Sequence, residues 1–315
     1  MTNSPSPTLD LRSTAMLLLL AAVWGGSFFF GEVALQEVPP LTITLYRVIG
    51  ALPVLAAIVV LKRIPIPRSI RIWWAYLVMG ALNNAIPFSL IFWGQTQIES
   101  GLASILNGTT AMFGAVVAGL LLRDEPLTTK KVIGAALGLA GVAFIMGPEA
   151  ITDFNPSNLA QLAILGATLS YAFAGVWGKT ALSAQPPLMN ALGMVAGSTL
   201  LMTPMVLIFD GPPNLMLSTS IWGALTGLAV LSTALAYVLY FAILARAGAA
   251  NLLLVTLLVP PFAIGLGVLF LGEAMGKQEW IGFGIIAVGF AVTDGRLFSL
   301  FRRKARVATK PGHGS

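Results

Sequence analysis

The sequence lacks cysteine, has a single histidine and is poor in charged residues. Of its 315 residues, 57% are hydrophobic and only 10% are charged, and the one histidine is His313. An ordinary soluble domain carries about 25% charged residues, so a chain with this little charge could not cover a soluble surface. The absence of cysteine excludes disulfide frameworks, thiolate metal sites and thiol redox chemistry. We therefore expect an all-α polytopic membrane protein that is not an enzyme and holds no metal or other cofactor.

Long apolar runs fill nearly the whole chain. A membrane-spanning helix needs about 20 mainly apolar residues. Proline, glycine and charge clusters divide the sequence into ten such runs, predicted at 14–35, 40–61, 72–94, 98–122, 129–147, 158–179, 186–209, 219–245, 248–271 and 277–295. Because nine further spans follow it, we interpret the first run as an uncleaved span and not as a signal peptide. What remains is a short N-terminal segment, 1–13, and a basic tail, 296–315.

The basic residues fall on one side of this ten-span arrangement. If the N-terminus is cytoplasmic, 16 of the 18 Lys and Arg lie in cytoplasmic segments, Lys277 lies outside and Arg47 lies within a span. Positive charge concentrates on the cytoplasmic side of membrane proteins. The distribution predicts a multi-pass protein of a bacterial inner (plasma) membrane with both termini in the cytoplasm.

The chain also repeats itself. When the sequence is aligned with itself at an offset of 147 residues, and of 148 in the later part, Gly, Pro and Glu residues coincide. Examples are Pro39–Pro40 with Pro186–Pro187, Gly101 with Gly248 and Glu125 with Glu273. The two glutamates are predicted to cap the next helix or fix the loop. Each repeat, 14–147 and 158–295, holds five spans, and an odd number inverts the second repeat in the membrane. Inverted repeats recur in secondary transporters, with the substrate site near the midplane; a duplicated anchor or scaffold is the alternative.

Several motifs occur in order in both halves. They are LLLLAAVWGGSFFFGEVAL, LTITLYRVIGAL and LLLRDEPLTTKKVIGAALGLAGVAFI in the first half and VPPFAIGLGVLFLGEAMGKQEWIGFGIIAVGFAV in the second. These motifs resemble the EamA repeat of the drug/metabolite transporter superfamily, and the chain looks closest to YddG-type amino-acid exporters. The resemblance implies a bundle in which the first, third, fourth, sixth, eighth and ninth spans wall a central cavity, with the fifth and tenth at the periphery. One departure is that Pro260 and Pro261 correspond to Met112 and Phe113, so the two halves need not hinge alike.

Two adjacent amides, Asn83 and Asn84, fall near the middle of the third span. Polar groups at membrane depth are costly and usually face a cavity or a partner. Neighbouring residues on a helix diverge by about 100°, so one amide can face the cavity and the other a neighbouring helix. An amide offers donors and an acceptor, which suits a zwitterionic substrate; hydrogen bonding between helices is the alternative role.

Aromatic and hydroxyl groups complete the predicted substrate contacts. Trp24 and Tyr171 are repeat mates near the midplane, where their rings could stack on an apolar or aromatic substrate or attract a cation; core packing is the competing interpretation. The remaining predicted contacts are polar groups of the fourth and eighth spans, namely Asn107, Ser232, Thr233 and Tyr237.

Arg47 is the one basic residue well inside a predicted span. It could pair with Glu32, near the outer end of the first span, or attract a substrate carboxylate. Because the second span lies outside the cavity wall that the resemblance implies, we favour the pair, with a structural or gating role. Pro260 and Pro261 remove two backbone donors from the ninth span, so we expect a hinge there, bent toward the pathway.

The predicted function is export of amino acids, with apolar or aromatic side chains preferred, by alternating access. Proton relays need acidic residues or histidine at the membrane centre; since none is expected there, we predict a facilitator or exchanger without tight proton coupling. The alternatives are export of drugs or other small metabolites of the same superfamily, and a non-transporting membrane scaffold or sensor. We expect a small-molecule substrate and the lipid bilayer as partners, no nucleic acid, and a chain that can act as a monomer.

Overall fold

The computed structural model of the protein describes residues 10–147 and 156–294, and within these ranges it is helical with no strand. The first half contains α1 (Leu11–Ala34), α2 (Pro40–Leu61), α3 (Ile70–Gly80), η1 (Ala81–Ala85), α4 (Ile86–Gln95), α5 (Ser100–Asn107), α6 (Thr110–Leu121) and α7 (Thr129–Met146). The second half contains α9 (Pro156–Ala181), α10 (Pro187–Phe209), α11 (Thr219–Thr226), η2 (Gly227–Leu235), α12 (Ala236–Leu252), α13 (Val255–Leu266), η3 (Gly267–Leu271) and α14 (Lys277–Asp294). The segments η1, η2 and η3 are π-helical.

Helices occupy every range predicted as a span. Eight helical stretches of the described chain are long and apolar enough to cross a membrane, and Val255–Leu271 is a shorter apolar helix. The described residues of α14 also include three charged ones, Lys277, Glu279 and Asp294. The all-helical membrane fold is confirmed, whereas ten crossings and an inverted repeat stay predictions. The predicted segments 1–13 and 296–315 lie wholly or largely outside the described residues, and α1 already begins at Leu11.

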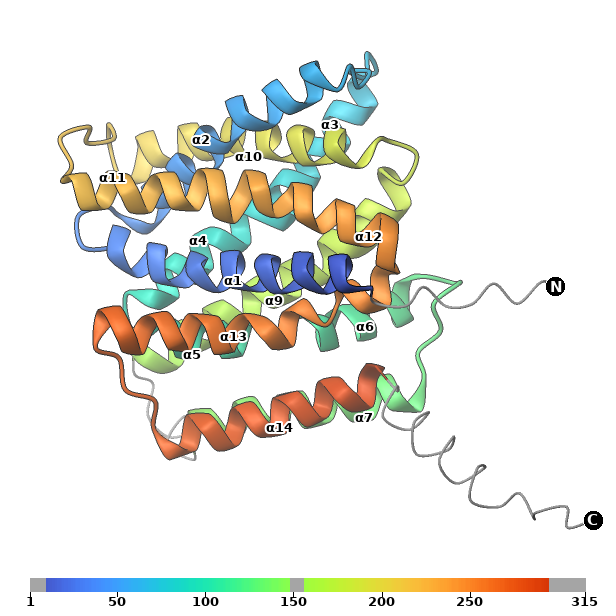
Figure 1. Ribbon diagram of the computed structural model, residues 1–315, viewed down its shortest axis with the longest axis vertical. Helices are drawn as coiled ribbons and strands as arrows, with labels where there is room; N and C mark the ends of the chain where they lie inside the picture. The colour runs from blue at the N-terminus through green and yellow to red at the C-terminus, as the bar shows by residue number, and fades with distance from the viewer. Residues whose placement is uncertain (1–9, 148–155, 295–315) are drawn as a thin grey trace, which may run out of the picture.

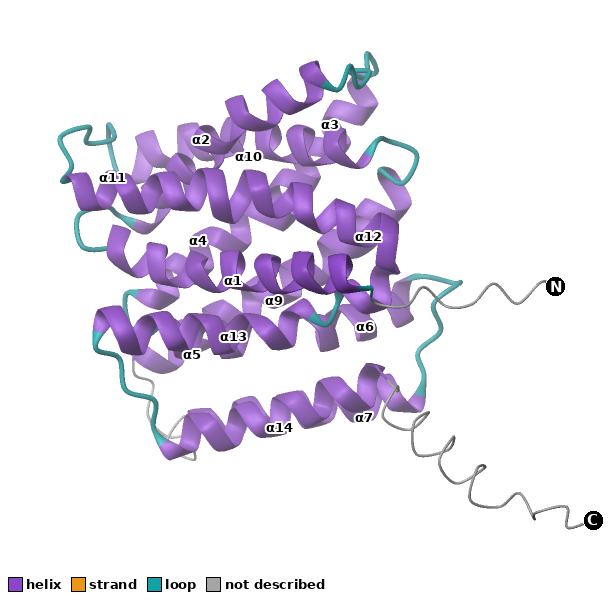
Figure 2. Ribbon diagram, in the orientation of Figure 1, coloured by secondary structure: helices purple, strands orange, loops and turns teal. Residues whose placement is uncertain are grey.

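The helices run roughly side by side in a single bundle (Figure 1). Helix α1 packs between α13 and the α11–α12 stretch, and α10 packs on α2 and α3. Helices α7 and α14 pack along each other at the lower edge of the bundle in the view of Figure 1. Figure 2 shows that the described connections are short turns at the two ends of the bundle. Helices from the two halves of the sequence therefore alternate through the bundle.

Glycine allows the α7–α14 pair to approach closely. A Cβ atom placed on Gly134 would lie 2.6 Å from the carbonyl oxygen of Gly289, and one on Gly141 would lie 2.9 Å from that of Gly282. Small residues let helix backbones meet in membranes, where van der Waals packing drives helix association. These glycines of α7 therefore serve a contact within the chain.

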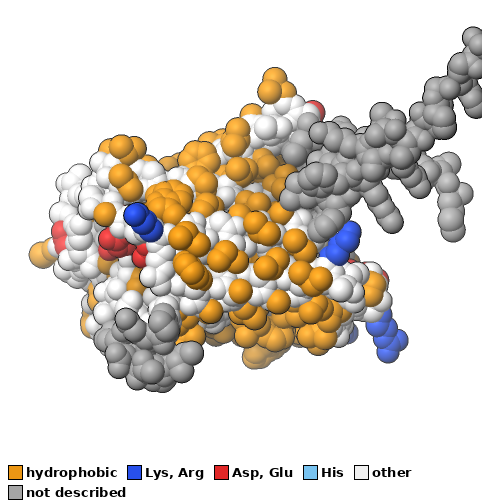
Figure 3. All heavy atoms as spheres, turned by 90° about the horizontal axis from the view of Figure 1, so that it is seen from below, with side chains coloured by type: hydrophobic (Ala, Val, Ile, Leu, Met, Phe, Trp, Pro, Cys, Tyr) orange, Lys and Arg blue, Asp and Glu red, His pale blue; other side chains and the backbone are white. Residues whose placement is uncertain are grey.

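The outer surface is apolar around the bundle. On the face over α7 and α14, hydrophobic side chains dominate and the Lys, Arg, Asp and Glu side chains that are visible gather at its two ends (Figure 3). Large hydrophobic side chains such as Leu200, Leu269 and Ile208 are more than two-thirds exposed. A soluble monomer rarely exposes so large an apolar area, so this belt fits contact with lipid tails.

Two of the predicted spans contain a break. Between α5 and α6 the chain turns at Gly108 and Thr109, and between α12 and α13 it turns at Leu253 and Leu254. Gly248 lies at φ +77°, outside the helical region, so α12 is interrupted there as well. Helix breaks at membrane depth are tolerated where neighbouring protein or a cavity satisfies the freed backbone groups. Residues Ser100–Leu121 still rank among the eight stretches long and apolar enough to cross a membrane, whereas the helix described within the predicted span 248–271 is the shorter Val255–Leu271.

Candidate substrate-binding site

Two π-helical segments carry polar residues into the bundle. Segment η1 contains Asn83 and Asn84, and η2 contains Ser232 and Thr233. The Thr233 hydroxyl donates to the carbonyl oxygen of Leu228, five residues earlier, at 2.8 Å. Shifted by 147 residues, η1 falls within η2, so the same distortion recurs in both halves. Such π-segments are rare and frequently mark functional sites.

The amide of Asn84 is fully buried and joins helices of both halves. Its Nδ2 donates to the hydroxyl oxygen of Ser198 at 3.1 Å, and its Oδ1 accepts from the Tyr237 hydroxyl at 2.7 Å. The half-buried Asn83 donates from Nδ2 to the Tyr237 hydroxyl oxygen at 3.2 Å. We call Asn83, Asn84, Ser198 and Tyr237 the amide network. Asn84 thus takes the predicted role toward a neighbouring helix, which leaves Asn83 as the amide with room for another partner.

Ser198 was missed at the sequence level. It lies on α10, which corresponds to the seventh predicted span and was not expected to line the cavity. Serine is also common in membrane helices. Its hydroxyl also donates to the carbonyl oxygen of Met194 at 2.8 Å, which is an ordinary backbone bond for serine in a helix. No signal in the sequence sets it apart from other serines.

Arg47 is buried in a cage of neutral groups. Its Nε donates to the Thr233 hydroxyl oxygen at 2.9 Å, Nη1 to the Ser27 hydroxyl oxygen at 2.9 Å, and Nη2 to the Ser232 carbonyl oxygen at 3.1 Å. Its Cζ lies 3.7 Å from the ring centre of Phe88. We call Ser27, Phe88, Ser232 and Thr233 the arginine cage. The cage joins α1 and α2 to η2. Its Thr233 lies four residues before Tyr237 of the amide network along the continuous η2–α12 stretch, and we call the cage and the network together the central polar cluster.

The predicted pair between Arg47 and Glu32 is not formed. Glu32 Oε2 accepts a hydrogen bond from Gln95 Nε2 at 3.2 Å, and the same amide donates to the carbonyl oxygen of Phe28 at 2.8 Å. In the sequence, 186 residues separate Arg47 from its partner Thr233. The prediction overlooked Gln95 and these long-range hydroxyl partners.

The predicted aromatic residues lie beside the cluster. Trp24 and Tyr171 are half-buried and pack against the same group of buried hydrophobic side chains. The ring of Trp24 lies 6.0 Å from that of Tyr240, centre to centre. The residue before it, Val23, accepts a bond from the Ser232 hydroxyl at 2.9 Å, which ties this part of α1 to η2.

Asn107 lies at the break between α5 and α6. Its Oδ1 is buried and has no hydrogen-bond partner within the described residues. Its carbonyl oxygen accepts from the Thr110 hydroxyl at 2.6 Å, across the turn at Gly108 and Thr109. No described contact connects Asn107 to the amide network.

The prolines of α13 do not interrupt their helix. Pro260 is buried, Pro261 is exposed, and α13 continues through both. The break lies before them, at Leu253 and Leu254. Helix α13 packs very closely on α1, because a Cβ atom placed on Gly25 would lie 2.6 Å from that of Phe262. A break thus lies one to two turns before the prolines, and the hinge at Pro260 and Pro261 stays a prediction.

Glu273 and Glu125 make different contacts. The Glu273 carboxylate accepts from the backbone N–H groups of Ser100 at 2.8 Å and Gly101 at 3.1 Å, so it caps α5, a helix of the other half and not the next helix as predicted. Glu125 pairs with Lys179 at 2.7 Å. Burial, with the nearby Glu273 charge adding to it, raises the pKa of Glu99, the residue before α5.

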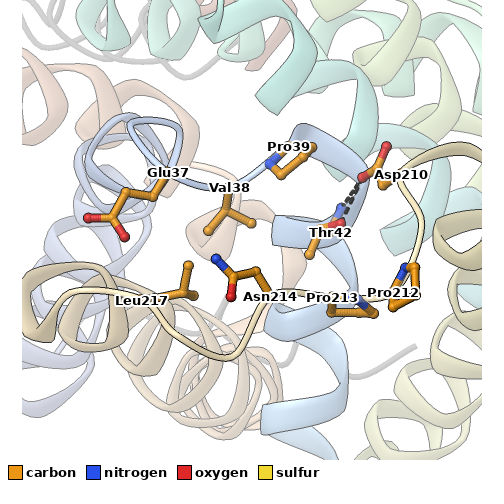
Figure 4. A pocket seen from close by; sticks show the side chains of 9 residues that line it. All are labelled: Glu37, Val38, Pro39, Thr42, Asp210, Pro212, Pro213, Asn214 and Leu217. Atoms are coloured by element: carbon orange, nitrogen blue, oxygen red, sulfur yellow. Dashed lines mark hydrogen bonds between the residues drawn. The ribbon is translucent and has the colours of Figure 1, made fainter.

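A pocket lies among the turns at one end of the bundle, and Figure 4 shows the side chains that line it. It holds about 120 Å³ and is lined by the turns between α1 and α2 and between α10 and α11. The Asp210 carboxylate accepts from the backbone N–H of Thr42 at 3.0 Å and from its hydroxyl at 2.7 Å, which fixes the start of α2. None of the predicted site residues lines this pocket.

A helical membrane bundle with polar groups of both halves in its interior is compatible with a secondary transporter, in which the substrate site lies between two repeats. The chain belongs to the EamA-like transporter family, which it matches over residues 12–147 and again over residues 158–293. The resemblance found in the motifs is thus confirmed at the level of the family, and the protein is a multi-pass membrane protein of a transporter family.

Curated relatives cover nearly the whole chain. The uncharacterized transporter YvbV of Bacillus subtilis is 30% identical over 290 residues, which covers 90% of this chain and 92% of the relative. The uncharacterized transporter YoaV of the same bacterium is 26% identical over 291 residues, covering 91% and 97%. Protein PecM of Dickeya dadantii is 26% identical over 290 residues, covering 90% and 92%.

A solved structure, described only as a crystal structure of a protein, has the same fold. It superposes with a TM-score of 0.65 at 19% identity and covers 90% of this chain and 96% of the other.

Proposed function

We propose that the protein exports amino acids, with apolar or aromatic side chains preferred, by alternating access between its two halves. The observation that carries the proposal is the central polar cluster. The amide network around Asn84 and the cage around Arg47 each join residues of the first family match to residues of the second. Groups shared between two moving halves can bind a substrate and exchange their partners as the halves rock.

The chemistry of the cluster suits a zwitterion of no net charge. Its described side chains are amides, hydroxyls, aromatic rings and one guanidinium. The guanidinium offers donors to a carboxylate, and the Asn83 Oδ1 atom offers an acceptor to an ammonium group. Trp24, Tyr240 and Tyr171 supply ring faces nearby, which favours an apolar or aromatic side chain.

The proposal includes ten spans arranged as two inverted five-helix repeats. The double family match and the recurrence of the π-segment support the duplication. The charge distribution along the sequence supports cytoplasmic termini in a bacterial inner membrane. Nothing in the proposed cycle requires a second copy of the chain.

Transport runs down a gradient or by exchange, without tight proton coupling. A proton relay needs a titratable acid or histidine in the pathway, and the contacts of the central cluster involve neither. Imposing different pH gradients on liposomes that contain the protein should leave phenylalanine uptake constant. Uphill accumulation of phenylalanine driven by a pH gradient alone would contradict this part of the proposal.

Export of other small molecules is the second candidate. The family match fits a drug or another metabolite equally well. A cationic drug would be held best by a carboxylate, whereas the cluster offers a buried cation, and this observation favours an amino acid. A scaffold or sensor would leave the reconstituted protein without any saturable flux.

Counterflow of labelled phenylalanine in liposomes tests the proposal. We expect saturable flux in the wild type, loss of most flux in Trp24→Ala and Asn83→Ala, and nearly full flux in Trp74→Ala, a matched control on the lipid-facing surface, 62% exposed. Absence of saturable flux for every amino acid tested would contradict the proposed function. Normal flux in both site variants would contradict only the assigned contacts.

A further inference from the structure

Arg47 combines deep burial with spare hydrogen-bonding capacity. Only 6% of the residue is exposed. A guanidinium has five N–H donors, and the hydrogen bonds to Thr233, Ser27 and the Ser232 carbonyl use one each from Nε, Nη1 and Nη2. The two terminal nitrogens therefore each keep one N–H for a further acceptor.

The charge of Arg47 has no counterion in the described structure. Ion pairs there join Lys179 to Asp124 and Glu125, and Arg246 to Asp10. Glu32 is bonded to Gln95. The Phe88 ring, 3.7 Å from Cζ, attracts the cation through its face, but a ring face carries no net charge.

A buried cation without a counterion is expensive inside a membrane. Membrane proteins keep such groups mainly where they pair with another group or serve a pathway. The cage around Arg47 joins both halves of the chain, and its Thr233 lies four residues before Tyr237 of the amide network. Arg47 therefore lies where a substrate between the two halves could contact it. An anionic group of that substrate could balance its positive charge.

We propose that Arg47 is the subsite that binds the carboxylate of the transported substrate. This inference rests on the proposed transport of amino acids and names the group that distinguishes them from amines and amides. The planar guanidinium can bond both oxygens of a carboxylate at once through the donors of its two terminal nitrogens. The Ser27 hydroxyl accepts from Nη1 in the present structure, so its own proton is available to the incoming carboxylate.

A purely structural role would use the same cage. In that case Arg47 would tie α1, α2 and η2 together, and its loss would lower the stability of the protein and the flux of every substrate alike. If Arg47 binds the substrate carboxylate, its replacement should weaken only the recognition of substrates that carry a carboxylate. The two roles are separated by the ratio of the apparent affinities for a substrate with a carboxylate and for its amide.

The test measures competition against counterflow of labelled phenylalanine by unlabelled phenylalanine and by phenylalaninamide, in wild type, Arg47→Gln and Lys179→Gln. Lys179→Gln is the matched control, since it removes a basic residue at the end of the bundle that is paired with carboxylates. We expect the wild type and the control to prefer phenylalanine. In Arg47→Gln the preference should fall by roughly 10- to 100-fold, the loss expected for a charge-assisted pair.

An unchanged preference in Arg47→Gln would overturn the subsite while leaving the proposed function intact. If the wild type transports no amino acid, the proposed function and the subsite both fail. That result is obtained with the wild type alone, before any variant is made. Arg47→Lys gives the same comparison if the glutamine variant does not fold. Lysine keeps the charge but cannot bond two oxygens in a fork, so an intermediate preference is expected and a wild-type ratio would again overturn the subsite.

Discussion

Arg47 inside the bundle and two basic residues at its ends, Lys179 and Arg246, are held in opposite ways. Lys179, with a side chain 39% exposed, lies 2.6 Å from Asp124 and 2.7 Å from Glu125, and Arg246 lies 3.1 Å from Asp10. Arg47, which is buried, bonds to two hydroxyls and a carbonyl and lies near the rings of Phe88 and Phe92. Of these three cations, the one that loses most hydration is the one for which the described residues provide no counterion.

The difference separates stability from function. An exposed ion pair contributes about 0–1 kcal/mol, because water and salt screen it. A buried charge costs several kcal/mol of desolvation, and a well-packed apolar group of similar size is often as stable or more so. Surface pairs at the ends of the bundle need no further explanation, whereas Arg47 has to be explained by what it binds.

The largest effect is expected from replacing Arg47 with an apolar residue of similar length. Arg47→Met should lower phenylalanine flux at least about tenfold, the effect of losing a charge-assisted contact, while the thermal midpoint stays equal or rises. Counterflow and thermal unfolding in detergent measure the two quantities. A large drop in the midpoint would make Arg47 a structural tie and would remove the contrast with the surface cations.

The amide network should behave in the reverse way. Asn84→Ala removes the hydrogen bonds to Ser198 and Tyr237 and should destabilise the protein by about 1 kcal/mol, at roughly 0.6 kcal/mol for each bond between helices in a membrane. Asn83→Ala should lower stability less than Asn84→Ala and lower the flux more. The reason is that Asn83 is half-buried and its Oδ1 acceptor remains available to a substrate. Equal effects of the two variants on unfolding and on flux would contradict this division of roles.

The capping glutamate provides a smaller effect. Glu273→Gln weakens the cap on α5 and should cost about 0.5–1 kcal/mol through the loss of charge at the helix N-terminus. Glu125→Gln, its repeat counterpart, affects only a half-exposed pair and should cost a few tenths of a kcal/mol. Chemical unfolding of both variants checks the order, and a larger loss in Glu125→Gln would contradict it.

The smallest effect is a pH dependence at the start of α1. Hydrogen bonds from Ser13 to the Asp10 carboxylate lower the pKa of Asp10 to about 2 from 3.8, with Arg246 adding to the shift. A lowered carboxyl pKa stabilises the folded state above pH 4 and loses that contribution as the pH falls toward 2. Between pH 5 and pH 2.5 the thermal midpoint of the wild type should therefore fall slightly more than that of Asp10→Asn, and an identical fall would contradict the assignment.

The sequence predicted the helical ranges because length and apolarity determine them. It also located most of the cluster, since amides, hydroxyls and one arginine are rare at membrane depth. It did not predict the π-segments or the breaks at Gly108 and Leu253, which depend on how neighbouring helices satisfy freed backbone groups. The contacts of Arg47 with Ser27 and Thr233 were also missed, because these side chains meet only after helices from both halves have packed.

The central claim is that the polar cluster lines the path of the substrate, and the natural absence of cysteine allows a direct measurement. Asn83→Cys gives a single thiol in the cluster, and Leu200→Cys gives one on the lipid-facing surface, where the leucine is 68% exposed. We expect a charged, water-soluble thiol reagent to label Asn83→Cys and not Leu200→Cys, and phenylalanine to slow that labelling. Failure of Asn83→Cys to react, or labelling that saturating phenylalanine does not slow while the variant still transports it, would contradict the claim.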